Sequence, residues 1–595
     1  MNITNRLAAL RELMVTTKVD AYFISNSDSH GTARIADYWR SLEWITGFTG
    51  SSGLAIITAD KAALWTDGRY LIQAKQDLDG TGIEVLDIWE QGGRSHHIFL
   101  AENLPHGGKL GFDGHVIPAM RLDRFKTELK DKGITFSYDI DLIGELWRDR
   151  PALPSIRAFE HEICFAGMPA SEKLAAVRAK MAEKKYAAYL ITALDDIAWL
   201  LNIRGKDIPY LPVVYAYALI TATDAHVFIE PNKAANVSGM LVSQGFELHN
   251  YNYLSHYLCK LDTGKLYYNP AITNIHISEA IPANIETESD QTGGIIPLIK
   301  AVKTETEQSN IVNAFRKDGI VFVKTLIWLD DMLKKDTPEL QIRECDIAHT
   351  LENYRTMQPN YICESFPTIS AYAENAAIAH YRPGPESTRL QREGLLLIDT
   401  GGQYLDGTTD TTRTVALGPI TDEMKRNFTL VLKGHIALAS AVFLSGTTGS
   451  GLDILARQNL WKSGQNFSHG TGHGLGYCLS VHEGPHFIAP YHTPIALTPG
   501  MLVSNEPGLY IEGSYGIRIE NILLVVEEHK NDSGTYLSFK NLTHCPIDLN
   551  VIDIDMLTET EREWLNNYHH CTYETLSPYL SVSENAWLKN ATRPI

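Results

Sequence analysis

The stretch HGTGHGLG, 469–476, places two histidines four residues apart among four glycines. On a helix this spacing would put both imidazoles on one face, as in the zinc-binding pattern H-E-x-x-H. The interior glycines disfavour a helix, and the glutamate of that pattern is missing. The stretch also lacks the Lys-Ser/Thr ending of a phosphate-binding loop. A metal site and a plain glycine-rich connection both remain open from these residues alone.

Two aspartates lie beside strand-like runs earlier in the chain. The apolar run 395–398 ends on Asp399, and a run rich in β-branched residues surrounds Asp410. An Asp-Gly pair at 406–407 lies between them and is typical of a hairpin turn. Strands joined in this way run antiparallel, so we expect Asp399 and Asp410 to lie near each other. A salt bridge to Arg413 is the simpler explanation for aspartates in such strands.

Two glutamates lie beside later apolar runs. Glu506 follows the run in MLVSNEPGLY. In GIRIENILLVV, alternation turns Ile517 and Ile519 to one face and Arg518 and Glu520 to the other.

Taken singly, each of these four carboxylates is most often a surface or ion-paired group. Four on neighbouring strands repel one another and stay ionised only when cations compensate them. Their charge balances two divalent ions. One imidazole from 469–476 would complete a mainly oxygen site suited to Mn²⁺, Co²⁺ or Zn²⁺.

The order of these residues resembles the five-ligand pattern of the pita-bread metallopeptidases, a family that includes methionine aminopeptidase, prolidase and aminopeptidase P. The chain is most similar to the three-domain, cytosolic aminopeptidase P group, over essentially its full length. The motifs that carry the resemblance are FTGSSGLAIIT…LWTDGRY, ALDDIAWLLNIRG, DGTTDTTRT, HGTGHG, VHEGPH, GIRIEN and VIDIDMLTETEREWLNNYH.

The resemblance implies a dinuclear metal site. Asp410 and Glu520 would bridge two divalent ions. Asp399 would bind one of them, and His473 and Glu506 the other. Mn²⁺ is the expected metal, with Co²⁺ or Zn²⁺ as alternatives. Glu506 would also shuttle a proton during catalysis.

The resemblance also implies roles for three histidines. His380, in AIAHYRPGP, and His482, in SVHEGPH, would contact the substrate and stabilise the tetrahedral intermediate. His469 would line the substrate cleft. A lone histidine is usually structural, so these catalytic and substrate-binding roles depend on the motifs.

Arg518 matches a family arginine near the site and would fix a bridging carboxylate or balance the neighbouring charge. His486 and His492 match no family position, and we expect them at the surface or behind the site.

The activity implied by the resemblance is hydrolysis of the X-Pro bond, which releases the first residue of peptides with proline in second position. Water shared by two divalent ions loses a proton near neutral pH, and the ions would also hold the free α-amino group. An X-Pro bond is a tertiary amide without an N–H, but no spacing in the sequence shows a pocket for the proline ring.

Two alternatives remain. Prolidase is limited to X-Pro dipeptides and usually lacks the middle domain and the C-terminal extension. A non-catalytic, peptide-binding pita-bread protein typically loses metal ligands. All five ligand positions are filled here, which disfavours that alternative and also disfavours creatinase, a metal-free relative.

The elements that must position these residues form several domains. AYFI at Ala21 is repeated as AYLI at Ala188, EWITGFTG as AWLLNIRG, and LAIITADKAALWTD as YALITATDAHVFIE, in the same order. This repeat predicts two related α/β domains. The proline-rich RDRPALPSI predicts a linker between them.

A second boundary falls where Thr304 and Glu307 have capping-box spacing ahead of a long helix to Leu333. We therefore predict a multidomain α/β and α+β fold. It has related α/β domains at 1–150 and 151–303, a pita-bread (creatinase/aminopeptidase-like) catalytic domain at 304–540, and a helical extension at 541–595 that packs on it.

The 595-residue chain has a net charge of −19, which argues against nucleic-acid and membrane partners. Its seven cysteines are scattered without a C-x-x-C pair, as expected for reduced thiols in the cytoplasm. The first twenty residues have the pattern of an amphipathic helix and no signal peptide. The resemblance further implies a homodimer.

Overall fold

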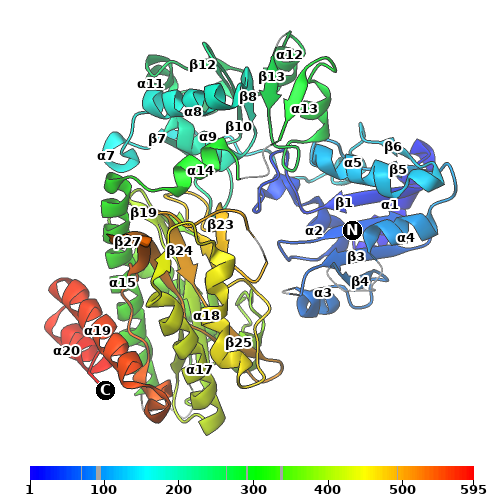
Figure 1. Cartoon of the computed structure of the whole chain (residues 1–595). Helices are drawn as coiled ribbons and strands as arrows, with labels where there is room; N and C mark the ends of the chain where they lie inside the picture. The colour runs from blue at the N-terminus through cyan, green and yellow to red at the C-terminus, as the bar shows by residue number, and fades with distance from the viewer. Residues whose placement is uncertain (69, 89–94, 263, 290–292, 336–339, 492) are drawn as a thin grey trace. The chain divides into compact units, whose positions relative to one another are not determined.

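The computed structural model describes residues 1–68, 70–88, 95–262, 264–289, 293–335, 340–491 and 493–595 (Figure 1). The chain divides into two units. The N-terminal unit comprises Met1–Glu160, Met168–Pro209 and Val213–Gln291, and the C-terminal unit comprises His161–Gly167, Tyr210–Pro212 and Thr292–Ile595.

The N-terminal unit contains two six-stranded sheets with the same topology. Their strand orders are β4-β3-β2-β1-β5-β6 and β12-β11-β10-β8-β13-β14. In each sheet three consecutive strands, β3-β2-β1 or β11-β10-β8, are antiparallel to one another, and the remaining strands are added in parallel on either side. The first sheet has β1 (Ala21–Ser25), β2 (Leu54–Thr58), β3 (Ala62–Thr66), β4 (Glu84–Asp87), β5 (Lys109–Gly111) and β6 (Thr135–Ser137). The second has β8 (Ala188–Ile191), β10 (Ala216–Thr221), β11 (Ala225–Ile229), β12 (Glu247–His249), β13 (Lys265–Tyr267) and β14 (Glu286–Glu288).

The repeat in the sequence corresponds to this repeated topology, so the prediction of two related α/β folds is confirmed. AYFI forms β1 and AYLI forms β8, the fourth strand of each sheet order. The repeated apolar hairpins form β2–β3 and β10–β11. The predicted domain boundaries remain predictions.

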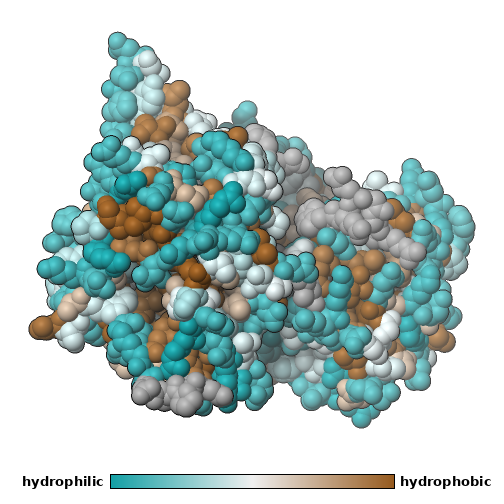
Figure 2. All heavy atoms as spheres, turned by 90° about the horizontal axis from the view of Figure 1, so that it is seen from below, coloured by the Kyte–Doolittle hydropathy of each residue, from teal (hydrophilic) through white to brown (hydrophobic). Residues whose placement is uncertain are grey.

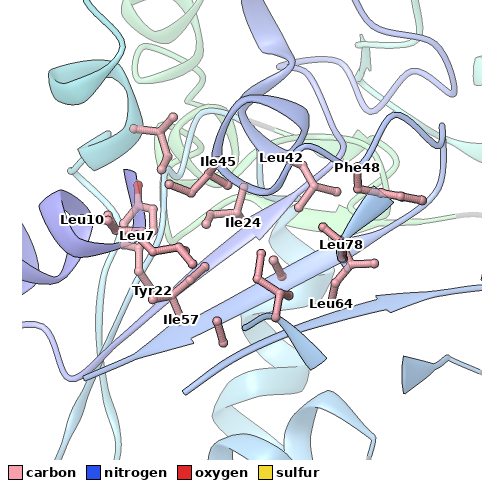
Figure 3. Close-up of a cluster of buried hydrophobic side chains, with 14 of the residues drawn as sticks. Leu7, Leu10, Tyr22, Ile24, Leu42, Ile45, Phe48, Ile57, Leu64 and Leu78 are labelled. Carbon is pink, nitrogen blue, oxygen red and sulfur yellow. The ribbon is translucent and has the colours of Figure 1, made fainter. Parts of the chain in front are cut away.

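Both faces of the first sheet are buried, which explains its continuous apolar strands. Tyr22 and Ile24 point into one core cluster, whereas Phe23 points into another on the opposite face. In the first cluster, helix α1 (Ile3–Thr17) packs Leu7 and Leu10 against the sheet (Figure 3).

The C-terminal unit is built on a six-stranded sheet, order β21-β28-β27-β24-β22-β23, with two three-stranded sheets, β16-β17-β20 and β15-β18-β19. Four of these strands are β15 (Tyr361–Glu364), β16 (Ile369–Tyr372), β21 (Phe443–Leu444) and β28 (Gly534–Asn541). The strands that matter for the site are β17 (Leu395–Thr400), β20 (Thr411–Ala416), β22 (Gly472–Gly474), β23 (Glu483–Ile488), β24 (Leu502–Asn505), β26 (Tyr515–Arg518) and β27 (Asn521–Asn531). The main helices are α15 (Glu305–Leu333), α16 (Glu344–Thr356), α17 (Asp422–Ala439), α18 (Gly449–Trp461), α19 (Glu559–Leu576) and α20 (Val582–Ala591).

Two predicted helices are confirmed with their caps. Helix α15 begins at a capping box in which the Thr304 side chain accepts from Glu307 N–H and the Glu307 side chain accepts from Thr304 N–H. Helix α19 occupies the predicted C-terminal helix and places Leu565 and Tyr568 in a core cluster with residues of α17.

The prediction that one turn joins the strands of Asp399 and Asp410 into a hairpin is wrong. Strands β17 and β20 are antiparallel, with Asp399 opposite Thr412, as expected. The chain between them forms a separate hairpin, β18 (Gly402–Tyr404) and β19 (Gly407–Thr408). Asp406 at its turn is buried because it accepts hydrogen bonds from Lys317 Nζ (2.5 Å) and Asn313 Nδ2 (2.6 Å).

Hydrophilic side chains predominate on the face shown in Figure 2, with hydrophobic ones in smaller patches between them. Among the described residues, no helix combines the length and apolar character needed to cross a bilayer.

Acid is expected to weaken the contact of α19 with the segment before it. His569 is fully buried, and its Nε2 accepts a hydrogen bond from Ile547 N–H (3.0 Å). Burial, and then the Arg413 cation, lower the pKa of His569 to about 3. The folded chain therefore binds fewer protons than the unfolded one, so stability falls as the pH drops below the unfolded value of 6.5.

Between pH 7 and roughly pH 4.5 this single group should cost about 2–3 kcal/mol, at 1.36 kcal/mol per pH unit below its unfolded pKa. Urea unfolding at both pH values measures the loss. His569→Gln, which keeps an acceptor but does not titrate, should lose less, whereas the exposed His570→Gln should behave as wild type. An equal loss of stability in His569→Gln and His570→Gln would contradict the assignment of the acid effect to His569.

Candidate metal centre

Strand ends in the C-terminal unit position the five predicted ligands. Asp399 lies on β17 and Asp410 directly precedes β20. His473 is the middle residue of β22, Glu506 follows β24, and Glu520 lies between β26 and β27.

The glycine-rich stretch is a strand, because glycine lets its backbone approach its neighbours closely. Strand β22 pairs with both β23 and β24. A Cβ at Gly472 would lie 1.9 Å from Ser504 O, and one at Gly474 would lie 2.2 Å from Glu483 O. His473 N–H donates to Ser504 Oγ (2.9 Å), which fixes the strand beside the apolar run that precedes Glu506.

Gly472→Ala should therefore displace β22 and destabilise the protein by about 1–3 kcal/mol, the usual cost of overpacking. Chemical unfolding and metal binding measure this together. Gly451→Ala on α18 is the matched control, since a Cβ there meets only an ordinary contact at 3.5 Å. Unchanged stability and metal affinity in Gly472→Ala would show that β22 tolerates the side chain.

The predicted ligands converge on one imidazole nitrogen. His473 Nε2 lies 3.4 Å from Glu506 Oε1 and 3.5 Å from Asp410 Oδ2. Ligand atoms of His473, Glu506 and Glu520 all lie within 4.8 Å of one another. His473 Nδ1 lies 2.9 Å from Gly474 O, so we infer that Nδ1–H donates to this carbonyl and leaves the Nε2 lone pair facing the carboxylates.

The buried carboxylates repel one another and need cations to compensate their charge. Burial, followed by repulsion from Asp399 and Glu506, raises the pKa of Asp410 well above its usual range. Burial also raises the pKa of Glu506, and burial with the charge of Asp410 raises that of Glu520. Divalent cations would relieve this repulsion and keep all four groups ionised.

Asp399 is held differently, and it offers an open oxygen. Its Oδ2 accepts from Arg518 Nη2 (2.6 Å). Its Oδ1 is buried and has no hydrogen-bond partner among the described residues. A buried carboxylate oxygen needs a partner, so this orphan acceptor beside three further carboxylates fits a bound metal ion. The donor set of four carboxylates and one imidazole suits a hard or borderline divalent ion.

Arg518 connects two of the carboxylates. Besides Asp399, its Nε donates to Thr412 Oγ1 (3.2 Å), and Thr412 Oγ1 donates to Glu520 Oε2 (2.8 Å). Arg518 thus contacts Asp399 directly and Glu520 through Thr412. The alternative ion pair with Arg413 is wrong: Arg413 donates instead to backbone carbonyls, including that of Cys545 (2.8 Å).

The predicted substrate histidines lie at different depths. His482 is exposed, and its ring meets that of His473 edge to face, with centroids 4.3 Å apart. His469 is half-buried, with Nε2 2.9 Å from Tyr510 Oη, which also accepts from Arg518 Nη1 (2.7 Å). His380 is half-buried in the turn after the 3-10 helix Ala373–Ala377.

His486, expected at the surface or behind the site, is buried behind β22. Its Nε2–H donates to Leu502 O (2.8 Å), and burial lowers its pKa to about 4. His492 lies outside the described residues.

A buried ion pair on α18 was not found from the sequence. Arg457 pairs with Asp453 (2.7 Å) and donates to His469 O (2.6 Å), while Thr471 Oγ1 donates to Asp453 (2.6 Å). This pair fixes the backbone just before His473. Its only signal in the sequence is an acid and a base four residues apart, a spacing that is common on solvated helix faces.

Family models cover most of the chain. The model for metallopeptidase family M24 matches residues 310–527, and that for the C-terminal region of peptidase M24 matches 535–595. Two models for the creatinase/prolidase N-terminal domain match residues 6–143 and 149–307.

Full-length relatives carry related names. Aminopeptidase P2 of Arabidopsis thaliana is 37% identical, covering 100% of this chain and 89% of the relative. The probable Xaa-Pro aminopeptidase P of Tuber melanosporum is 37% identical over 100% of both chains. The solved X-prolyl aminopeptidase of Caenorhabditis elegans, described as a cytosolic enzyme with a di-nuclear active site, superposes with a TM-score of 0.94 at 33% identity, covering 100% of both chains.

Two creatinase-type α/β domains ahead of a buried set of carboxylates and an imidazole define a metallopeptidase. The chain belongs to the aminopeptidase P group of metallopeptidase family M24.

Proposed function

We propose that this protein hydrolyses the X-Pro bond at the amino end of peptides and releases the first residue, using two divalent metal ions, Mn²⁺ foremost. The observation that carries the proposal is the buried convergence of Asp410, Glu506 and Glu520 on His473 Nε2, with Asp399 close to it in the cluster. Asp410 and Glu520 would be shared by both ions, with Asp399 on one and His473 with Glu506 on the other.

When bound, the ions supply Lewis acidity toward the scissile carbonyl and make water acidic enough to attack near neutral pH. Glu506 is the proposed proton carrier. Ser504 Oγ donates to its Oε1 (3.2 Å), which orients the carboxylate. It takes the proton of the attacking water and delivers it to the nitrogen of the departing proline.

The remaining residues hold the substrate and the cluster. The exposed imidazole of His482 next to His473 can donate to the oxygen that becomes negative in the tetrahedral intermediate, and His380 is proposed to assist it. His469, which contacts Tyr510, is proposed to line the substrate cleft. Arg518 holds Asp399 and, through Thr412, Glu520, so that both carboxylates face the ions.

The test compares release of the first residue from Arg-Pro-Pro and from the dipeptide Arg-Pro, with protein stripped of metal and then supplied with Mn²⁺. Mn²⁺-dependent cleavage of the tripeptide is the expected result. Cleavage of the dipeptide alone would reassign the chain as a prolidase. The solved Xaa-Pro dipeptidase of Bacillus anthracis, 23% identical, covers 64% of this chain and shares the fold. No cleavage of either peptide with metal bound would leave a peptide-binding role.

We also propose a cytoplasmic location and a homodimer. The first is supported by the description of the Caenorhabditis elegans enzyme as cytosolic. The second is supported by the resemblance to the three-domain group, and sedimentation equilibrium would measure it. Peptides are the proposed partners. Nucleic-acid partners are disfavoured by the net charge of −19.

A further inference from the structure

We propose that the second sheet of the N-terminal unit carries a divalent transition-metal site, best matched to Zn²⁺, formed by His226, Glu247 and His249. His226 lies on β11, and the other two lie on β12. Strand β12, labelled in Figure 1, is an edge strand of this sheet. All three residues belong to the N-terminal unit, so the proposal does not rest on the peptidase activity.

The strand register brings the three side chains together. Strands β11 and β12 are parallel, with His226 opposite Glu247 and Phe228 opposite His249. Residues two apart on a strand share a face, so both imidazoles and the carboxylate point to the same side of the sheet. The Phe228 ring lies beneath His249, with centroids 5.3 Å apart.

The ligand atoms already have the spacing of a tetrahedral site. His226 Nδ1 lies 3.1 Å from His249 Nε2 and 3.3 Å from Glu247 Oε2, and His249 Nε2 lies 3.9 Å from the same oxygen. Ligands bound to Zn²⁺ at 2.0–2.1 Å with tetrahedral angles are roughly 3.3–3.4 Å apart. Three of the four ligand positions of a tetrahedral ion are therefore in place. The Glu247 side chain is 62% exposed, so solvent can supply the fourth ligand.

A hydroxyl holds the far side of one imidazole. Tyr257 Oη, on α12 (Leu254–Leu258), lies 3.1 Å from His249 Nδ1. A partner on the second nitrogen is what orients a metal-binding histidine, because it selects the tautomer with a free Nε2 lone pair.

The first sheet shows that the fold itself does not require these histidines. In both sheets the hairpin register and the parallel edge pairing coincide, so His226, Glu247 and His249 correspond to Ala63, Glu84 and Leu86. The same strand pair thus forms with aliphatic residues at both histidine positions. The second sheet adds two imidazoles beside a carboxylate that both sheets have.

The experiment counts Zn²⁺ bound per full-length chain by equilibrium dialysis, in wild type and in His249→Ala. The catalytic centre contributes equally to both, so the variant should bind one equivalent less. His256→Ala is the matched control, since this exposed histidine adjoins Tyr257 outside the cluster. Tyr257→Phe should keep the equivalent with about 10-fold or more weaker affinity, the usual cost of losing such a partner.

Equal stoichiometry in wild type and His249→Ala would overturn the proposal and leave a hydrogen bond between two imidazoles. Should His249→Ala fail to fold, Glu247→Gln gives the same comparison, because its exposed side chain can change without disturbing the core. Loss of the equivalent in His256→Ala as well would equally overturn the assignment. Cleavage of Arg-Pro-Pro is expected to be unchanged in every variant, so failure of this site and failure of the proposed function are distinguishable.

Discussion

Asp410→Asn is expected to abolish cleavage of Arg-Pro-Pro while the protein stays folded. An amide cannot replace a carboxylate that serves both proposed ions, and metal ions supply several kcal/mol of transition-state stabilisation. At 1.36 kcal/mol per tenfold change in rate, kcat/KM should fall by about 10³-fold or more. Because burial, and then repulsion from Asp399 and Glu506, raise the pKa of Asp410, removing its charge should not destabilise the metal-free chain.

Metal content measured beside activity makes this prediction specific. The variant should retain less than the full complement of Mn²⁺ at concentrations that saturate wild type. Asp532→Asn, at an exposed turn, removes the same charge and should change neither quantity. Near-normal turnover in Asp410→Asn with both ions bound would rule out the bridging role.

Arg355→Met is expected to produce the largest loss of stability. The Arg355 guanidinium has no exposed area, and it donates to Asp318 (2.7 Å), to Thr400 (2.7 Å) and to Glu364. Removing one partner of a buried ion pair leaves its carboxylates without a counter-charge, which costs about 3–5 kcal/mol. Tyr404 Oη donates to Asp318 as well (3.0 Å), so this network joins α15, α16 and the segment that follows Asp399.

Urea unfolding of the metal-free protein isolates this effect from metal binding. Arg124→Met is the matched control because its side chain is 60% exposed and 3.6 Å from Glu128, and it should change stability by no more than about 0.5 kcal/mol. A loss below about 1 kcal/mol in Arg355→Met would mean that water or a shifted side chain replaces the guanidinium.

Local patterns predicted much of this fold. The capping box at Thr304 is a short-range signal and marked the start of α15. The repeated apolar hairpins predicted two related α/β domains, and the two sheets share one topology. Alternation around Ile519 separated core side chains from Arg518 and Glu520 correctly.

Contacts between distant residues were beyond the sequence. The Asp-Gly pair at 406–407 predicts a turn that joins β17 and β20 directly. Nothing in the sequence near Asp406 indicates its ion pair with the distant Lys317. The Asp453–Arg457 pair has a spacing typical of exposed helices. It is buried here, and its partners are Thr471 and the carbonyls of Phe467 and His469, which lie outside the helix. The metal-ligand order was recognisable by resemblance, whereas the sequence predicted no role for Tyr510 or Thr412, which support Arg518.

The contacts of Arg413 also set an order of events during synthesis. This buried side chain on β20, three residues after Asp410, donates to Cys545 O and to Tyr568 Oη (2.6 Å). Those acceptors are translated more than a hundred residues later, so β20 cannot reach its final hydrogen bonding while the ribosome still holds them. The N-terminal unit can fold first, as domains generally do on the ribosome. The hydrogen bonds of β20, which begins directly after the candidate ligand Asp410, are therefore completed only once α19 has been translated.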